Sequence, residues 1–175
     1  MHLPIETERL RIRPFRPEDA PLLYRIHLEP AVKQWFPNES YADLAETEGA
    51  IEFFSDCVLQ QHLPYVLAIE LKATGELIGD TGMSEVDGAP AEMEIGYVIT
   101  EAHAGKGYAS EAARAMTRFT ADYFGANTFW GRVVKGNAAS TRVLEKAGYA
   151  FVREESGAED DPYGNGMLVY RKTLN

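Results

Sequence analysis

The chain has 175 residues, of which 45% are hydrophobic and 25% are charged, as in a folded protein with a full hydrophobic core. Its formal net charge of −10 argues against a nucleic-acid partner, because neutralising phosphates requires a basic surface. The single cysteine, Cys57, excludes an internal disulfide, and no apolar run is long enough to cross a bilayer. Residues 1–6 also lack the basic and apolar regions of a secretion signal, so we expect one cytoplasmic domain spanning residues 1–175.

The first third of the chain predicts one strand followed by helices. Residues 9–13 alternate between polar and apolar side chains, as in a half-buried strand. Pro17 suits the first turn of a helix that ends before Pro30. Apolar residues at helical spacing predict a longer helix from about Tyr41 to Gln61. Between these helices, residues 35–37 are expected to form a short helical or turn segment whose aromatic side chains line either the core or a pocket.

Three strands are predicted next. Residues 65–71 and 76–83 flank a turn that contains Gly75, which is the pattern of a β-hairpin. Residues 84–90 are expected to form a polar loop, and residues 91–99 the third strand. Gly96 inside this strand predicts either a bulge or the close approach of a ligand.

The remainder of the chain alternates between helices and strands. Helices are predicted at 110–124 and 137–147, and strands at 127–134, 149–153 and 167–174, with an acidic loop at 154–165. Gly125 and Gly148 are placed to end the two helices. A strand meander followed by this alternation indicates a mixed α/β sheet covered by helices.

A glycine-containing loop, residues 104–110, joins the third strand of the meander to the next helix. Gly105 and Gly107 allow a tight turn, and the helix N-terminus offers unpaired N–H groups at the positive end of the helix dipole. This arrangement binds phosphate or another anion. A nucleotide-binding P-loop would need Ser or Thr after Lys106, and the dinucleotide fingerprint would need glycine in place of Ser110. The four histidines are not spaced as a metal site.

Four segments of the chain resemble the GNAT superfamily of acyl-CoA N-acyltransferases, in particular its RimJ/RimL-type branch of ribosomal-protein acetyltransferases. These segments are residues 7–13, 94–97, 105–112 and 137–149, and they occur in the order that the family has. The resemblance implies a mixed, mostly antiparallel, seven-stranded sheet with helices on both faces. It also implies an N-acetyltransferase that uses acetyl-CoA and no metal.

The resemblance further implies which residues bind the acetyl-CoA donor. The loop would hold the pyrophosphate, while the strand before it would diverge from its neighbour at a bulge and pair with the pantetheine arm. Ala104 stands where the family usually has Arg or Gln. The resemblance implies that Asn137 contacts the pantetheine arm or a nearby backbone group. Asn137 also suits a helix N-cap, either as its sole role or in addition to that contact. The expected donor residues are Tyr97, Val98, Ile99, Ala104, Gly105, Lys106, Gly107, Tyr108, Ala109, Ser110, Asn137 and Ser140.

Acyl transfer to an ammonium requires a base for the nitrogen, a proton donor for the departing thiolate and a donor for the oxyanion. Glu94 is the first candidate for the base, and Glu92, two residues earlier on the same strand face, is the reserve. A neighbouring carboxylate would raise the pKa of Glu94; the alternative is that both glutamates merely face solvent. Leu144 occupies the position of the family's tyrosine acid. Ser140 is the candidate acid in its place, because it stands where the ribosomal-protein branch has a serine that is the proposed substitute for the tyrosine. A strand N–H near Val98 would bind the oxyanion.

The acceptor is the least constrained part of the prediction. Acidic residues near the strand ends (Asp80, Glu85, Asp87 and Glu92) favour a cationic amine. The branch resemblance favours the α-amine of a protein or peptide. A small amine, such as a polyamine, an aminoglycoside or an amino-acid-like compound, is an alternative, as is a non-catalytic acyl-CoA sensor. We expect the protein to be a monomer or a homodimer.

Overall fold

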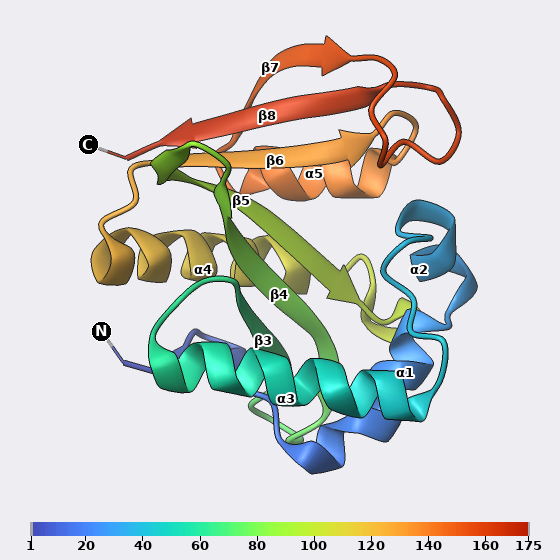
Figure 1. Cartoon of the computed structure of the whole chain (residues 1–175), viewed down its shortest axis with the longest axis vertical. Coiled ribbons are helices and arrows are strands. Elements are labelled where there is room, and N and C mark those ends of the chain that lie inside the picture. The colour runs from blue at the N-terminus through green and yellow to red at the C-terminus, as the bar shows by residue number, and fades with distance from the viewer. Residues whose placement is uncertain (1, 175) are drawn as a thin grey trace.

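A single eight-stranded sheet organises the molecule in the computed structural model, which describes residues 2–174 (Figure 1). The first and last residues of the expected 1–175 domain lie outside the described residues. The strand order is β1-β2-β3-β4-β5-β6-β8-β7, and among residues 2–174 only the β5–β6 pairing is parallel. The strands are β1 (Ile5–Glu6), β2 (Leu10–Arg13), β3 (Tyr65–Leu71), β4 (Leu77–Val86), β5 (Ala89–Ile99), β6 (Thr128–Val134), β7 (Ala150–Glu155) and β8 (Met167–Thr173).

The prediction of a mixed, mostly antiparallel sheet is confirmed, but the strand count of seven is wrong. The additional strand is β1, which contributes two residues, Ile5 and Glu6, to an antiparallel pairing with β2. Two residues are too few to show an alternating pattern, so periodicity cannot reveal such a strand.

Helices cover both faces of the sheet. They are α1 (Ala20–His27), α2 (Pro30–Trp35), α3 (Leu44–Gln60), α4 (Tyr108–Phe124) and α5 (Ala138–Lys146). Helices α1 and α3 pack on one face, where Leu23 and Ile51 meet Ala68 and Leu77, whereas α4 and α5 pack on the other. The predicted helix at 41–61 begins at Leu44, because the Asp43 side chain caps it by accepting a hydrogen bond from the Glu46 N–H. None of the helices among residues 2–174 has the length and apolar character needed to cross a bilayer.

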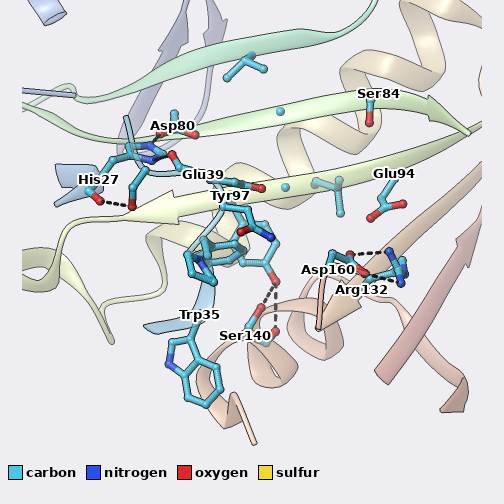
Figure 2. A pocket seen from close by; sticks show the side chains of 18 of the residues that line it. His27, Trp35, Glu39, Asp80, Ser84, Glu94, Tyr97, Arg132, Ser140 and Asp160 are labelled. Carbon is cyan, nitrogen blue, oxygen red and sulfur yellow. Dashed lines mark hydrogen bonds and ion pairs between the residues drawn. The ribbon is translucent and has the colours of Figure 1, made fainter. Parts of the chain in front are cut away.

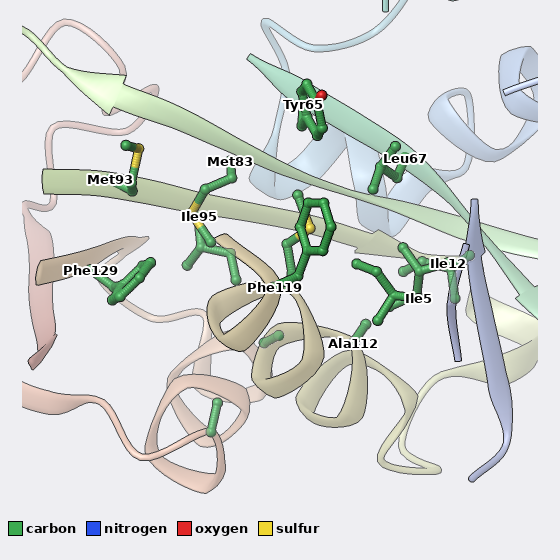
Figure 3. Close-up of a cluster of buried hydrophobic side chains, with 14 of the residues drawn as sticks. Ile5, Ile12, Tyr65, Leu67, Met83, Met93, Ile95, Ala112, Phe119 and Phe129 are labelled. Atoms are coloured by element: carbon green, nitrogen blue, oxygen red, sulfur yellow. The ribbon is translucent and has the colours of Figure 1, made fainter. Parts of the chain in front are cut away.

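The main core lies between α4 and the central strands (Figure 3). Phe119 on α4 is buried against Tyr65 of β3, with ring centroids 6.2 Å apart. Met83, Met93 and Phe129 extend the same core along β4, β5 and β6. This apolar contact fixes the beginning of α4, and therefore the glycine loop, relative to the edge of β5.

Two predictions about the β4–β5 hairpin are corrected. The expected polar loop at 84–90 is mostly strand, since β4 continues to Val86 and β5 begins at Ala89. The turn between them contains Gly88 with φ of 75°. The register shift lies between Glu85 and Val86, whereas Gly96 pairs in register with Gly82, so the bulge is at the hairpin end and not at Gly96.

The strands β5 and β6 diverge in the middle of the sheet. Their parallel pairing covers only Glu92–Glu94 opposite Thr128–Trp130. Beyond Glu94 the two strands separate toward the glycine loop (Figure 1). The unpaired edge of β5 therefore faces an opening in the sheet, as the family resemblance implies, although no bulge at Gly96 causes it.

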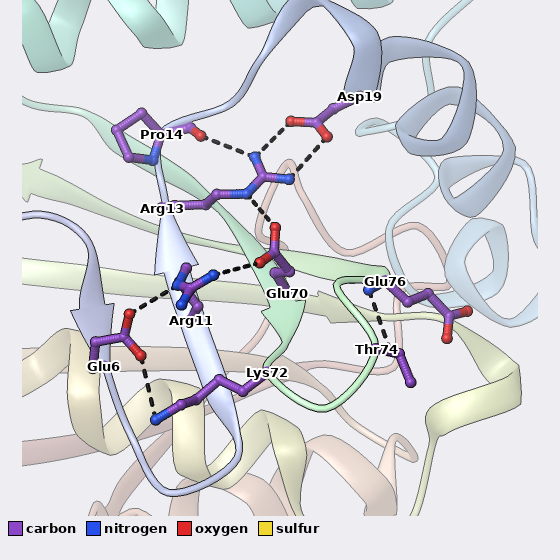
Figure 4. Close-up of polar contacts among 9 residues, drawn as sticks. All are labelled: Glu6, Arg11, Arg13, Pro14, Asp19, Glu70, Lys72, Thr74 and Glu76. Atoms are coloured by element: carbon purple, nitrogen blue, oxygen red, sulfur yellow. Dashed lines mark hydrogen bonds and ion pairs between the residues drawn. The ribbon is translucent and has the colours of Figure 1, made fainter.

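A buried ion network joins β2, β3 and the turn before α1 (Figure 4). The Arg13 guanidinium donates to both carboxylate oxygens of Asp19, at 2.8 and 3.0 Å, and to Glu70 at 2.7 Å. All three side chains are buried. Because a buried charge without a partner is costly, this network ties β2 and β3 to the start of α1.

Candidate functional site

Two cavities meet at the opening between β5 and β6. The first, which we call the loop cavity, has a volume of about 350 Å³ and reaches the glycine loop. The second, the acidic cavity, has a volume of about 510 Å³ and extends toward α1 and the loop before α3. Both have in their walls Trp35, Phe36, Tyr97, Asn137 and Ser140. A ligand in one cavity would therefore reach a ligand in the other at Tyr97 and Ser140.

The loop cavity gathers the residues expected to hold the donor. Eleven of the twelve line it: Tyr97, Val98, Ile99, Ala104, Gly105, Gly107, Tyr108, Ala109, Ser110, Asn137 and Ser140. The exception is Lys106, whose side chain turns back to donate to the Ala102 carbonyl at 3.2 Å. These residues come from β5, the loop, α4 and α5, so only the tertiary structure places them around one space.

The backbone of the glycine loop has the geometry of an anion site. Gly105 and Gly107 have φ of 75° and 83°, and α4 begins directly after Gly107. Within residues 2–174, the N–H groups of residues 105–110 donate to no protein acceptor, although those of Ala104 and Glu111 on either side do. Arg142 and Lys146 add positive charge to the cavity wall, and His103 Nδ1 is buried there without a partner in the described chain. These features fit a pyrophosphate.

A pair of hydroxyl groups marks the junction of the two cavities (Figure 2). The Tyr97 hydroxyl lies 2.9 Å from Ser140 Oγ and donates to the Ser140 carbonyl at 3.2 Å. Burial raises the pKa of Tyr97 to about 12, although the hydrogen bond with Ser140 opposes this shift. The Tyr97 hydroxyl is therefore protonated at neutral pH. We expected Tyr97 to serve only the donor's pantetheine arm, since no sequence pattern links it to a serine 43 residues away.

Helix α5 holds Ser140 in place. Asn137 is the N-cap of this helix, and its Oδ1 accepts a hydrogen bond from the Ser140 N–H at 3.2 Å. Leu144, at the position of the family's tyrosine acid, is buried against Gly131 of β6. A Cβ on Gly131 would lie 2.7 Å from both methyl groups of Leu144, so helix and strand are in direct contact there. Leu144 thus serves packing, and the hydroxyls nearest the junction are those of Tyr97 and Ser140.

The register of β4 and β5 determines which of the N–H groups near Val98 face the opening, where the oxyanion donor is expected. The Thr100 N–H donates to the Ile78 carbonyl, so the pair two residues along, Asp80 and Val98, is also a hydrogen-bonded pair. The Val98 N–H therefore points toward β4. The N–H groups on the open edge of β5 are those of Tyr97 and Ile99.

Glu94 lies in the acidic cavity and Glu92 lies outside its lining. Glu94 is half-buried, and burial raises its pKa; Arg132 opposes the shift, and Asp160 and Glu155 add to it. We expected Glu92 to be the carboxylate that raises this pKa, but its side chain instead accepts a 2.5 Å hydrogen bond from the Trp130 indole. Glu85 and Asp87, also expected near the acceptor, lie outside the lining.

The far end of the acidic cavity contains a buried histidine that the sequence did not single out. His27 Nε2 lies 2.7 Å from Asp80, and His27 Nδ1 lies 2.9 Å from the Glu39 carbonyl (Figure 2). Although burial lowers the pKa of His27, hydrogen bonding to Asp80 and to the Glu39 carbonyl raises it overall. Arg132, the other basic residue in the wall, is paired with Asp160 at 2.7 Å. The carboxylates of Glu39 and Glu94 form no ion pair within residues 2–174, so the cavity favours a cationic ligand.

Comparisons with known proteins point to one family. Residues 9–150 match the family model described as an acetyltransferase (GNAT) domain. An uncharacterised N-acetyltransferase, p20 from Bacillus licheniformis, is 28% identical over 163 residues, which cover 93% of this chain and 89% of the relative. The crystal structure of ribosomal-protein-S5-alanine acetyltransferase from Vibrio fischeri superposes with a TM-score of 0.82 at 16% identity, covering 96% of this chain and 94% of the other. The microcin C7 self-immunity acetyltransferase MccE, solved with acetyl-CoA and AMP, also has a TM-score of 0.82, at 15% identity over 99% of this chain and 100% of that one.

Proposed function

Because the chain belongs to the acetyltransferase (GNAT) domain family, an acetyl-CoA-dependent N-acetyltransferase family, we propose that it acetylates the α-amine of a protein or peptide N-terminus. The observation that carries this proposal is the meeting of the loop cavity and the acidic cavity at Tyr97 and Ser140. One cavity suits a pyrophosphate donor and the other suits a cationic acceptor. The two substrates are bound together, and the amine attacks the thioester directly.

In the proposed site, the loop cavity binds acetyl-CoA, which supplies the activated acetyl group. The N–H groups at the start of α4 bind its pyrophosphate, and the open edge of β5 at Tyr97 and Ile99 pairs with the pantetheine arm. One of the N–H groups on this edge stabilises the oxyanion that forms at the thioester carbonyl. Lys106 contributes its backbone to the loop, since its side chain turns away toward Ala102.

Glu94 is the proposed base. Its carboxylate accepts a proton from the acceptor ammonium, directly or through a water molecule, so that the nitrogen becomes nucleophilic. Its raised pKa makes it a better proton acceptor than an ordinary glutamate. Glu92 remains the reserve candidate, but it would first have to leave its hydrogen bond with Trp130.

The Tyr97 and Ser140 hydroxyls are the proposed proton donors to the departing CoA thiolate. With a pKa of about 12, the Tyr97 hydroxyl is still protonated when the thiolate departs, so it stabilises the sulfur by donating a hydrogen bond as the proton is delivered. Ser140 Oγ, 2.9 Å away, either orients the tyrosine proton or relays it. Ser140 therefore acts together with Tyr97, which supplies the acidity that a serine hydroxyl lacks.

Product analysis tests the proposal. Incubation with acetyl-CoA and a library of short peptides should give N-terminally acetylated peptides by mass spectrometry, together with stoichiometric free thiol. Peptides with blocked N-termini but free lysines are the matched control and should remain unmodified. Acetylation of lysine side chains alone would contradict the proposed acceptor. The absence of thiol release with every amine would contradict the proposed activity.

A small polycationic amine is the second candidate acceptor. The observation that favours it is the number of carboxylates in the acidic cavity, namely Glu39, Glu46, Asp80, Glu94 and Asp160. A polyamine or an aminoglycoside in the same assay would compete with peptides for this space. Turnover of small amines with inert peptides at millimolar concentration would favour this candidate.

A further inference from the structure

Arg9, which directly precedes β2, contacts the glycine loop from the side of the N-terminal segment. Its Nε donates to Glu111 Oε2 at 2.7 Å, and its Nη1 donates to the Lys106 carbonyl at 2.9 Å. The guanidinium carbon also lies 4.4 Å from the centroid of the Tyr108 ring. One side chain therefore contacts the loop, the first residue of α4 and the first turn of that helix, about 100 positions further along the chain.

Glu111 links a second residue of the N-terminal segment to the same helix. Its Oε1 accepts hydrogen bonds from the Thr7 hydroxyl at 2.6 Å and from the Arg9 N–H at 2.9 Å. Burial alone would raise the pKa of Glu111, but these hydrogen bonds and the Arg9 charge hold it below its ordinary value. The carboxylate is therefore ionised at neutral pH and occupied by protein donors. It does not oppose an anionic ligand as a free charge would.

The contact with Lys106 determines how the loop presents its backbone. A peptide group is planar and trans, so its C=O and N–H point in opposite directions. Because Arg9 holds the Lys106 carbonyl on its own side, the Gly107 N–H of the same peptide group points away from Arg9. Gly107 lines the loop cavity and has a positive φ, a conformation that glycine adopts without a side chain to fix it.

We infer that Arg9 is a positioning residue for the donor: its guanidinium holds the Lys106–Gly107 peptide group so that the loop N–H groups face the pyrophosphate of acetyl-CoA. This inference rests on the proposed function. It gives a role to residues 7–9, which carry part of the family resemblance but lie outside the lining of both cavities. The planar fork of arginine suits the role, since Nε and Nη1 are separate donors in a fixed geometry, one to Glu111 and one to Lys106.

Ligands that share the pantetheine arm but differ in phosphates provide the test. We would measure the dissociation constants of CoA, of 3′-dephospho-CoA and of pantetheine for the wild type, Arg9→Ala and Arg9→Lys. Arg11→Ala is the matched control, because Arg11 is equally exposed on β2 (42% against 41% for Arg9) but pairs with Glu6 and Glu70. Both Arg9 variants should bind CoA and dephospho-CoA about tenfold more weakly, with pantetheine binding unchanged. Arg11→Ala should bind all three ligands like the wild type.

Each other outcome overturns the inference in a recognisable way. Equal weakening of all three ligands would make Arg9 a residue of general stability only. Weaker binding of CoA alone would indicate that Arg9 contacts the 3′-phosphate directly. A wild-type affinity in Arg9→Lys would indicate that a positive charge at this position is sufficient without the guanidinium geometry. Failure of the wild-type protein to bind CoA would refute the proposed donor itself, and the inference with it, whereas CoA binding by the wild type with unaltered Arg9 variants refutes the inference alone.

Discussion

The hydroxyl groups of Tyr97 and Ser140 lie 2.9 Å apart in the wall that the loop cavity and the acidic cavity share. The tyrosine comes from the unpaired edge of β5 and the serine from the first turn of α5, so β5 and the helix that follows β6 are joined across the opening between β5 and β6. In the proposed function this contact supplies the acid, since Leu144 replaces the family's tyrosine. It also makes the pair testable as a unit.

Substitution of this pair should lower kcat rather than the affinity for acetyl-CoA. We expect Tyr97→Phe and Ser140→Ala each to reduce kcat by about 10²-fold, because each interrupts proton delivery to the thiolate. The double variant should be hardly worse than either single one, since the two hydroxyls act together. Steady-state kinetics with saturating acceptor would measure these effects.

Tyr149→Phe is the matched control for that experiment. The Tyr149 hydroxyl is also buried and also bonds to a hydroxyl, Thr117 Oγ1 at 2.8 Å, but it lies outside the lining of both cavities. This variant should keep the wild-type kcat. Losses that simply multiply in the Tyr97/Ser140 double variant would contradict a shared role.

Glu94→Gln should lower kcat by about 10²–10⁴-fold by removing the base. The wild-type pH profile of kcat/KM should have an ascending limb, because Glu94 must be ionised, and its midpoint should exceed the ordinary glutamate pKa of 4.5. Glu94→Gln should lose that limb and retain only the titration of the acceptor amine. Glu92→Gln, at the neighbouring glutamate, is the control. A larger loss of kcat in Glu92→Gln than in Glu94→Gln would mean that Glu92 is the base.

The Glu94→Gln substitution should not destabilise the protein. Folding raises the pKa of Glu94, so the native state holds its proton more tightly than the unfolded state, and stability decreases as pH rises through that interval. At a pH above that interval, where Glu94 is ionised, Glu94→Gln removes this penalty. We expect an equal or higher Tm by thermal unfolding; a clear decrease would mean that the carboxylate has a structural partner.

Gly131→Ala should disturb the position of α5. Its Cβ would meet both Leu144 methyl groups at 2.7 Å, which we expect to cost about 1–3 kcal/mol of stability and to displace Ser140. Leu144→Ala alone should cost about 2–5 kcal/mol by leaving a cavity. Because the added methyl partly fills that cavity, the double variant should be more stable than the sum predicts. Urea unfolding of the wild type, the two single variants and the double variant would measure this coupling. Strictly additive losses of unfolding free energy would contradict it.

Arg13→Ala should destabilise the protein by about 3–5 kcal/mol, because it leaves the buried carboxylate of Asp19 without its cation and leaves buried Glu70 with only its 3.2 Å pair to Arg11. Arg11→Ala, which removes a more exposed guanidinium that pairs with Glu6 and Glu70 and leaves Glu70 paired with Arg13, should cost about 1 kcal/mol or less. Chemical denaturation at pH 7 would compare the two. Similar losses for both variants would mean that burial of the Arg13 network does not determine its contribution.

The sequence alone determined features that depend on local pattern. Alternation in residues 9–13 and helical spacing after residue 110 predicted β2 and α4, and the glycines around Lys106 predicted an anion loop, because these signals arise from neighbouring residues. Eleven of the twelve expected donor residues then lie around one cavity. The two-residue strand β1 and the extent of the β4–β5 hairpin were missed, since neither has a distinct periodic pattern.

Only the tertiary structure decided which distant side chains meet. Hydrogen bonds join Tyr97 to Ser140, Trp130 to Glu92 and Arg9 to the Lys106 carbonyl, each across a large separation in sequence. Asp160 and Glu155, also distant in sequence, raise the pKa of Glu94. These relationships follow from strand order, from the divergence of β5 and β6 and from the packing of α4 and α5. Such long-range contacts are set by the burial of the whole core, so no local pattern in the chain records them.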